Sequence, residues 1–179
     1  MGPLFGYAKL WDRVSDWTGW IASWLVLLAV LVSAGNAFVR YLFDYSTNGW
    51  LEMQWYMFAG MVLLGASVTL RMNEHVRVDV LYGGRGPRAK AWIDLLGLVF
   101  FLLPTMALLA WLSWPLFVDA WVRDEVSSNA GGLVRWPVKL LMPVGFALVA
   151  LQGLAEIIKR IGFLRGTYAM DTHYEKPLQ

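Results

Sequence analysis

Long uncharged, mostly hydrophobic stretches alternate with short charged segments along this chain. Residues 17–39, 53–70, 95–118 and 140–155 contain no Asp, Glu, Lys or Arg. A helix needs roughly 20 mainly apolar residues to cross the hydrocarbon core of a bilayer. Three of the stretches qualify directly, and the fourth does when its hydrophobic flanks are added. The pattern predicts an all-α integral membrane protein with four transmembrane helices, at about residues 19–40, 50–71, 91–118 and 137–158.

An amphipathic segment precedes the first span. Its charged residues are spaced at i, i+3, i+4 and i+7, and hydrophobic residues fill the opposite face. This period predicts a helix at residues 4–18 that lies flat in the membrane interface, apolar side down. A frayed terminus is the alternative. The charged set is Lys9, Asp12, Arg13 and Asp16, and the apolar set is Tyr7, Leu10, Trp11, Val14 and Trp17.

The distribution of basic residues indicates the orientation in the membrane. If the N-terminus lies in the cytoplasm, the outer segments carry only Arg40, Arg123, Arg135 and Lys139, and all other Lys and Arg residues lie inside. Short loops rich in Lys and Arg stay on the cytoplasmic side. We therefore predict a single membrane domain, residues 1–179, with both termini and the tail 159–179 in the cytoplasm.

The composition excludes several functional classes. The chain has no cysteine and two histidines, His75 and His173, both outside the predicted spans. A membrane disulfide oxidoreductase is therefore excluded, and no histidine pair is placed to ligate haem within the membrane. The formal net charge of +2 does not indicate nucleic-acid binding, because the basic residues border the membrane. No metal or other cofactor is expected in this chain.

The centres of the predicted spans are almost free of strongly polar side chains. Solute transport and intramembrane catalysis usually place ionisable groups at mid-depth, and the centres of these spans carry none. Pro104 interrupts the third span and is predicted to kink it. Small residues form faces that allow close approach of another helix, from this chain or from a partner. They are Ala29, Ser33 and Ala37 on the first span and Gly60 and Gly65 on the second.

Charged residues gather at the membrane edges. Arg40 ends the first span and Glu52 begins the second, so the two can pair with each other or with a partner subunit. An unpaired Glu52 carboxylate would be costly in its apolar surroundings. The charges that close the fourth span, Glu156, Lys159 and Arg160, are expected to be solvated. The long outer connection, residues 119–135, is expected to begin as a short surface helix.

Several motifs in order carry a family resemblance. They include Asn48-Gly-Trp-Leu-Glu-Met-Gln-Trp-Tyr56, Glu74-His-Val-Arg-Val-Asp79, Gly131-Gly-Leu-Val-Arg-Trp-Pro-Val-Lys139 and Leu151-Gln-Gly153. Over roughly residues 10–165, the chain resembles the small, DctQ-like membrane subunit of the tripartite ATP-independent periplasmic (TRAP) transporters. Within that family it is similar to the branch described as the mannitol/chloroaromatic or 2-oxo acid type.

The resemblance implies a division of labour in the bacterial inner membrane. A large subunit binds substrate and sodium ions and moves an elevator-type domain, and a soluble periplasmic protein delivers an organic acid. The small subunit braces the large one in a stable complex, contacts membrane lipids and helps the binding protein dock transiently. It is not an enzyme, and it binds neither sodium nor nucleic acid. The assembly performs secondary active symport.

Two sets of candidate site residues follow. The set expected to anchor helices or the subunit interface comprises Arg40, Glu52, Gln54, Arg71, Glu74, His75, Arg77 and Asp79. The set expected to dock the binding protein rests on topology alone and comprises Asp119, Arg123, Asp124, Glu125, Arg135 and Trp136.

A rival hypothesis is an intramembrane aspartyl peptidase that uses Asp44 and Asp119. Two carboxylates can share a proton and activate a water molecule. Asp44 lies in a polar turn and Asp119 heads a charged loop, so the sequence disfavours desolvation of either one. A self-sufficient four-span exporter would need a carboxylate at mid-membrane, and the span centres contain none.

Overall fold

The computed structural model is all-helical and describes residues 2–74 and 84–169. Four helical rods are long and apolar enough to cross a membrane, which confirms the predicted number of spans. His75, Arg77 and Asp79 of the candidate set lie outside the described residues. The elements are α1 (Gly2–Phe43), α2 (Asn48–Met72), α4 (Pro87–Gly97), the π-helix η1 (Leu98–Leu102), α5 (Leu103–Val122) and α6 (Trp136–Leu164).

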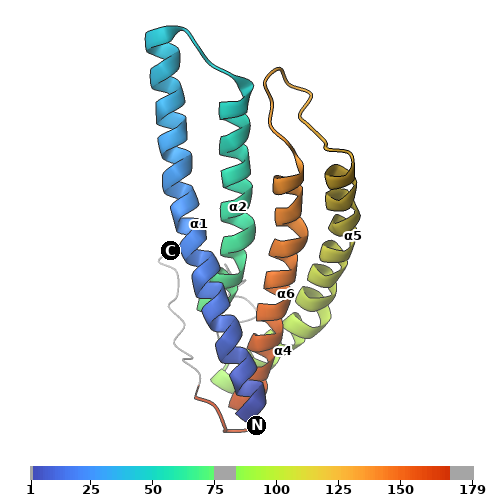
Figure 1. Ribbon diagram of the computed structural model, residues 1–179. Coiled ribbons are helices and arrows are strands. Elements are labelled where there is room, and N and C mark those ends of the chain that lie inside the picture. The colour runs from blue at the N-terminus through green and yellow to red at the C-terminus, as the bar shows by residue number, and fades with distance from the viewer. Residues whose placement is uncertain (1, 75–83, 170–179) are drawn as a thin grey trace.

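The rods stand side by side in the order α1, α2, α6 and α5 (Figure 1). One end of the bundle holds the start of α1 and the end of α6, and we call it the terminal end. The other end holds residues 44–47 and 123–135, and we call it the loop end. Which end faces the cytoplasm stays a prediction.

Helix α6 is the central element of the bundle. In its most apolar stretch 39% of the residues are buried, against 6–11% in the other three rods. A small apolar cluster, Leu70, Leu98 and Val149, joins α2, η1 and α6. The outward faces remain largely hydrophobic, as expected for helices surrounded by lipid or by another membrane protein.

Glycines let α2 approach its neighbours closely. A Cβ atom added to Gly145 of α6 would lie 2.7 Å from the Cβ of Leu63 and 3.0 Å from its carbonyl oxygen. Gly60 faces Leu25 of α1 in a similar way, with 2.8 Å from a built Cβ to Leu25 Cδ1. Because membrane helices associate through packing, these contacts hold the bundle together.

We expect Gly145→Ala to lower the free energy of unfolding by roughly 1–3 kcal/mol, because the backbone of α2 would have to move. Gly97 is the matched control, because a Cβ there meets nothing within 4 Å. Gly97→Ala should raise stability by about 0.5–1 kcal/mol through its helix propensity. The two variants can be compared by reversible unfolding in mixed micelles. Equal effects would contradict the close packing of α2 on α6.

The N-terminal segment differs from the sequence prediction. Residues 4–18 are the first part of one uninterrupted helix, α1, and not a separate helix, while their place in the membrane interface stays a prediction. Ser15 and Thr18 are buried and Asp12 is half-buried, whereas Lys9, Arg13 and Asp16 of the charged set remain exposed, as do Leu10 and Trp17 of the apolar set. The physical reason is that α6 and α2 supply hydrogen-bonding partners for Ser15 and Thr18, so a narrow polar strip that contains these two residues faces the bundle.

The third rod bends at Pro104 but stays helical. Proline has no N–H to donate to the preceding turn. The π-helical turn Leu98–Leu102 lies immediately before Pro104. Its wider hydrogen-bonding pattern accommodates the missing N–H, so the chain stays helical. Helices α4 and α5 run in different directions on the two sides of this turn (Figure 1). The geometry agrees with the predicted proline kink.

Candidate functional site

A hydrogen-bonded hub centred on Glu52 lies at the loop end. The Oε2 atom of Glu52 accepts a hydrogen bond from the backbone N–H of Leu133 at 2.7 Å. Its Oε1 atom accepts one from the Asn129 amide at 2.8 Å and another from the Ser127 hydroxyl. We call these four residues the loop hub. It ties the start of α2 to the connection between α5 and α6.

The rest of the motif 48–56 supports the same loop. The Asn48 amide donates to the carbonyl of Ala130 at 3.2 Å, and the Tyr56 hydroxyl donates to the carbonyl of Val134 at 3.2 Å. Gly49 lets the loop come close, because a Cβ there would lie 2.9 Å from the carbonyl oxygen of Gly131. The first turns of α2 therefore form a seat for the loop.

The loop itself is a hairpin, so the predicted surface helix in its first half is wrong. An antiparallel bridge pairs Val126 with Val134. The backbone N–H of Ser127 donates to Leu133 at 3.0 Å, and that of Arg135 donates to Glu125 at 2.8 Å. The cause is a tertiary contact. Glu52 on α2 accepts hydrogen bonds from Ser127, Asn129 and Leu133, and an extended loop can direct these three donors to one carboxylate.

The predicted docking residues lie around this hairpin. Asp119 and Arg123 form an ion pair of 2.7 Å, with side chains 52% and 75% exposed. Glu125 pairs with Lys139 and, at 3.5 Å, with Arg135. The hydrogen bond from Lys139 holds the pKa of the Glu125 carboxyl below its usual value.

Two further residues of the predicted docking set lie at the same end. Trp136 begins α6 and meets Trp121 edge to face, with ring centroids 4.6 Å apart. Asp124 has a positive φ of 47° where the chain leaves α5. The structure thus brings all six predicted docking residues to one end of α5 and α6, beside the loop hub.

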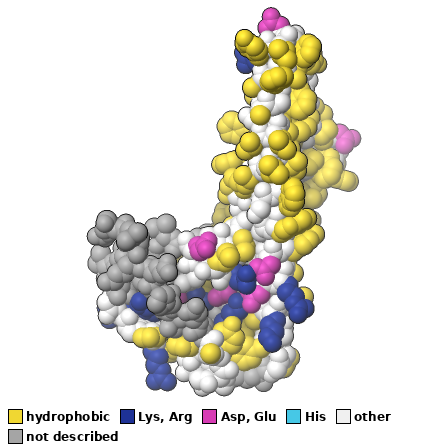
Figure 2. Space-filling model, turned by 90° about the vertical axis from the view of Figure 1, so that its left-hand side faces the viewer, with side chains coloured by type: hydrophobic (Ala, Val, Ile, Leu, Met, Phe, Trp, Pro, Cys, Tyr) yellow, Lys and Arg dark blue, Asp and Glu magenta, His cyan; other side chains and the backbone are white. Residues whose placement is uncertain are grey.

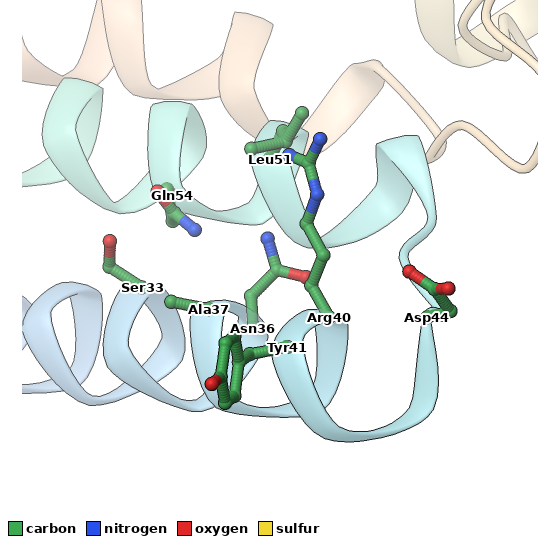
Figure 3. Close-up of a pocket in the computed structure, with 8 residues that line it drawn as sticks. All are labelled: Ser33, Asn36, Ala37, Arg40, Tyr41, Asp44, Leu51 and Gln54. Carbon is green, nitrogen blue, oxygen red and sulfur yellow. The ribbon is translucent and has the colours of Figure 1, made fainter.

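Of the two pairings expected for Arg40 and Glu52, the one with each other does not form. Within the described residues, the Glu52 carboxylate accepts hydrogen bonds from the hairpin and forms no ion pair with Arg40. Arg40 lies instead beside a cleft between α1 and α2, together with Gln54 (Figure 3). Arg40 and Gln54, both in the predicted anchoring set, therefore line this cleft and take no part in the loop hub.

A buried polar network occupies the terminal end. The Lys159 ammonium donates to Asp12 Oδ1 at 2.5 Å and to Glu156 Oε1 at 2.8 Å. The Gln152 amide donates to Asp12 at 3.0 Å and to Glu156 at 3.2 Å, and Gln152 Oε1 accepts from Ser15 at 2.9 Å. These contacts join the first turns of α1 to the last turns of α6.

Arg160 extends the network to α4. Its guanidinium pairs with Asp94 at 3.2 Å and with Glu156. Glu156, Lys159 and Arg160 are 5%, 8% and 3% exposed, so the expectation that they are solvated is wrong. The reason is that each charge has an opposite charge within reach, which makes burial tolerable. The terminal network comprises Asp12, Asp94, Gln152, Glu156, Lys159 and Arg160.

Helices α1 and α2 are joined beside this network. Arg71 pairs with Asp16, and the hydroxyls of Thr18 and Ser67 lie 3.1 Å apart. The backbone N–H of Glu74 donates to the carbonyl of Thr69 at 3.2 Å and closes the end of α2. Arg71 is therefore an anchor between two helices of the same chain.

The predicted packing residues divide into two groups. Gly60 is buried against α1, and a Cβ on Gly65 would be 3.6 Å from Ala22. On α1, Ala29 is half-buried, whereas Ser33 and Ala37 are exposed beside the cleft. The glycines of α2 thus serve the contact within this chain, and part of the α1 stripe remains without a neighbour.

The peptidase hypothesis gains no support from the geometry. Asp44 lies after the end of α1 and Asp119 near the end of α5, at opposite sides of the bundle (Figure 1). Asp119 is already engaged with Arg123.

In residues 2–74 and 84–169, no group of three or more His, Asp or Glu side chains is arranged to hold a metal ion.

The terminal network was not predicted from the sequence. A signal for it was present, because Gln152, Glu156 and Lys159 recur on one face of α6 at spacings of four and three residues. The complementary charge at Asp12 was assigned to the solvent face of an interfacial helix. Its role became visible only when α1 was placed along α6.

Comparisons with known proteins identify relatives of the chain. A family model described as "Tripartite ATP-independent periplasmic transporters, DctQ component" matches residues 29–162. The chain is similar to the C4-dicarboxylate TRAP transporter small permease protein DctQ of Vibrio cholerae serotype O1, with 31% identity over 122 residues. That match covers 64% of this chain and 53% of the relative, so the chain spans about half the length of the relative. No solved structure matches the chain.

Proposed function

The chain belongs to the DctQ component family of the tripartite ATP-independent periplasmic transporters, and from this premise we propose that it is a small permease subunit. It braces a large membrane subunit and presents a docking surface to a periplasmic binding protein. The large subunit carries the solute and the sodium ions. The transported solute is an organic acid, and a C4-dicarboxylate is the first class to test, since the Vibrio relative is described by that substrate.

One observation carries the proposal: the charged contacts lie at the two ends of the bundle, and hydrophobic surface covers the region between them. Figure 2 shows hydrophobic side chains along the upper part of the molecule on the α1 side, with charged side chains gathered at the terminal end and at the tip. A subunit that carried solute itself would need ionisable groups at mid-depth. Polar contacts hold the four helices together at both ends of the bundle, and their exposed hydrophobic faces can pack against a large membrane subunit, as a bracing subunit requires.

The hairpin at the loop end suits transient docking. The loop hub holds its backbone in place, while Asp119 and Arg123 stay exposed. Exposed charges at the rim of an interface mainly change the rate of association. We propose that the loop end faces the periplasm and both termini the cytoplasm, in accordance with the basic residues of the terminal end.

Co-expression of the tagged chain with its large subunit tests the bracing role. We expect the large subunit to co-purify with the chain, and uptake of labelled succinate to require both subunits and the binding protein. Uptake of the same rate without this chain would overturn the bracing role. A chain that accumulated succinate alone in liposomes would overturn the assignment of transport to the large subunit.

Arg123→Glu tests docking at the hairpin. Reversing an exposed rim charge should change the rate of association with the binding protein several-fold, and added salt should reduce the difference. Arg85→Glu is the matched control, an exposed arginine at the terminal end. The rates can be measured by surface plasmon resonance on the two-subunit complex in nanodiscs. Equal effects of the two variants would contradict docking at the loop end.

A further inference from the structure

A polar cleft opens between the loop-end parts of α1 and α2 (Figure 3). Its volume is about 490 Å³, and it is distinct from the loop hub, because the hairpin does not line it. Its lining includes Ser33, Asn36, Ala37, Arg40, Asp44 and Gln54. Tyr41 and Leu51 complete the lining, so polar and apolar surface are mixed in the cleft, whereas the surrounding helix faces are hydrophobic.

Three polar side chains point into the cleft. Ser33 and Asn36 are directed from α1 toward α2, and Gln54 is directed from α2 toward α1 (Figure 3). Asn36 is 8% exposed, and its Oδ1 accepts a hydrogen bond from Ser46 at 3.1 Å, while its amide nitrogen is directed into the cleft. Within the described part of the chain, neither the Ser33 hydroxyl nor the Gln54 amide forms a hydrogen bond.

Arg40 adds an uncompensated charge at the mouth of the cleft. In the parts of the chain that the structure describes, its guanidinium has no ion-pair partner, although Asp44 also lines the cleft. By contrast, Arg71 and Arg160 are each paired with a carboxylate within the chain. An acidic group from outside would complete the charge balance here.

The depth of the cleft selects the kind of occupant. Ser33 precedes Arg40, where the predicted first span ends, by seven residues, which corresponds to about 10 Å along a helix. Gln54 lies four residues inside the predicted second span, about 6 Å from its outer end. Both side chains are thus expected inside the outer part of the hydrocarbon core, where acyl chains offer no hydrogen bonds. A helix with polar side chains can supply hydrogen bonds at this depth and an acidic group at Arg40 together.

The surface also permits close approach of a helix. Ser33 and Ala37 lie one turn apart on α1, and both are exposed and small. The groove between α5 and α6 provides a contrast, because Ala107, Trp111, Trp114 and Val144 give it an apolar lining that lipid tails cover equally well.

We propose that the cleft receives a membrane-spanning helix of the large transporter subunit. This helix carries a hydrogen-bonding side chain opposite Gln54 and an acidic side chain opposite Arg40. The inference rests on the proposed function, since it takes the large subunit as the partner and assigns its contact to one face of the bundle.

Photo-cross-linking tests the assignment. The photoreactive residue p-benzoylphenylalanine replaces Ala37 in the cleft or, as the matched control, Ala107 in the groove between α5 and α6. Both alanines are exposed, and both line a groove of similar size. After irradiation of membranes that contain both subunits, the cross-linked product is quantified on immunoblots. We expect a yield from position 37 that exceeds the yield from position 107 by about tenfold.

Equal yields, a higher yield at position 107, or no product at position 37 overturns the assignment to the cleft. If the large subunit still co-purifies in that case, the proposed function stands and only the face is wrong. If the unsubstituted chain retains no large subunit at all, the proposed function itself fails.

A pair of substitutions gives an independent readout. Gln54→Leu removes the polar group without enlarging the side chain, and we expect about tenfold less co-purified large subunit, equivalent to a loss of about 1.4 kcal/mol. Leu112→Ala is a control on the exposed face of α5 and should leave the yield unchanged. Full retention by Gln54→Leu overturns the polar part of the proposal.

Discussion

Glu156→Ala is expected to lower the free energy of unfolding by about 3 kcal/mol. Glu156 is 5% exposed and pairs with both Lys159 and Arg160. Its removal leaves each cation with one carboxylate, Asp12 for Lys159 and Asp94 for Arg160. A buried charge that loses a partner destabilises the folded state more than an intact pair stabilises it.

Reversible unfolding in mixed micelles, followed by the fluorescence of the 11 tryptophans, measures this loss. Glu74→Ala is the matched control, an exposed glutamate at the same end of the bundle, and should change stability by less than about 0.5 kcal/mol. Glu156→Gln keeps a hydrogen-bond acceptor and should fall between the two. If Glu156→Ala unfolds like Glu74→Ala, the terminal network does not hold α1, α4 and α6 together.

Glu52→Ala is expected to release the hairpin at the loop end. The substitution removes the acceptor for three hydrogen bonds from the loop. Hydrogen bonds to a charged group contribute about 1.5–3 kcal/mol each, and the loss of one is enough to raise the open population of a loop about tenfold. Trypsin should therefore cut after Arg123 or Arg135 at least about ten times faster, because local opening exposes the backbone.

The measurement is a time course of limited proteolysis on the purified chain in detergent. Asp44→Ala is the control, because Asp44 is exposed in the other connection of the loop end. In the assembled transporter, Glu52→Ala should reduce assembly and uptake without changing which solute is selected, because the proposed function assigns the solute site to the large subunit. Cleavage of Glu52→Ala at the rate of Asp44→Ala would refute the anchoring role of the loop hub.

Only part of the loop hub was predictable from the sequence. Glu52 was singled out because a carboxylate in apolar surroundings needs partners, and that argument is local. Its partners were not predictable, because Leu133 lies 81 residues away in the sequence. The nearby Arg40 was the natural candidate by position, yet the hairpin supplies three donors that reach the carboxylate, and Arg40 remains at the cleft.

The direction of α1 illustrates the limit of amphipathic patterns. A helical stripe of Asp12 and Asp16 beside hydrophobic residues shows that two faces exist, but it does not show which face turns toward water. In a membrane protein the polar face can turn toward other helices. Here Asp12 contacts Gln152 and Lys159 on α6 and Asp16 pairs with Arg71 on α2, while Lys9 and Arg13 of the same face stay exposed.

The sequence by itself determined the properties that depend on neighbouring residues: four hydrophobic spans, the kink at Pro104, the charges at the membrane edges, and motifs that mark the family. These properties are local because hydrophobic transfer and helix periodicity are set within about 20 residues. Only the tertiary structure decided which charges are buried, which residues seat the hairpin, and where a polar cleft is left open. Those outcomes depend on how segments distant in sequence approach one another. Each polar group has many possible partners in the sequence, and only the three-dimensional arrangement determines which of them lies within hydrogen-bonding distance.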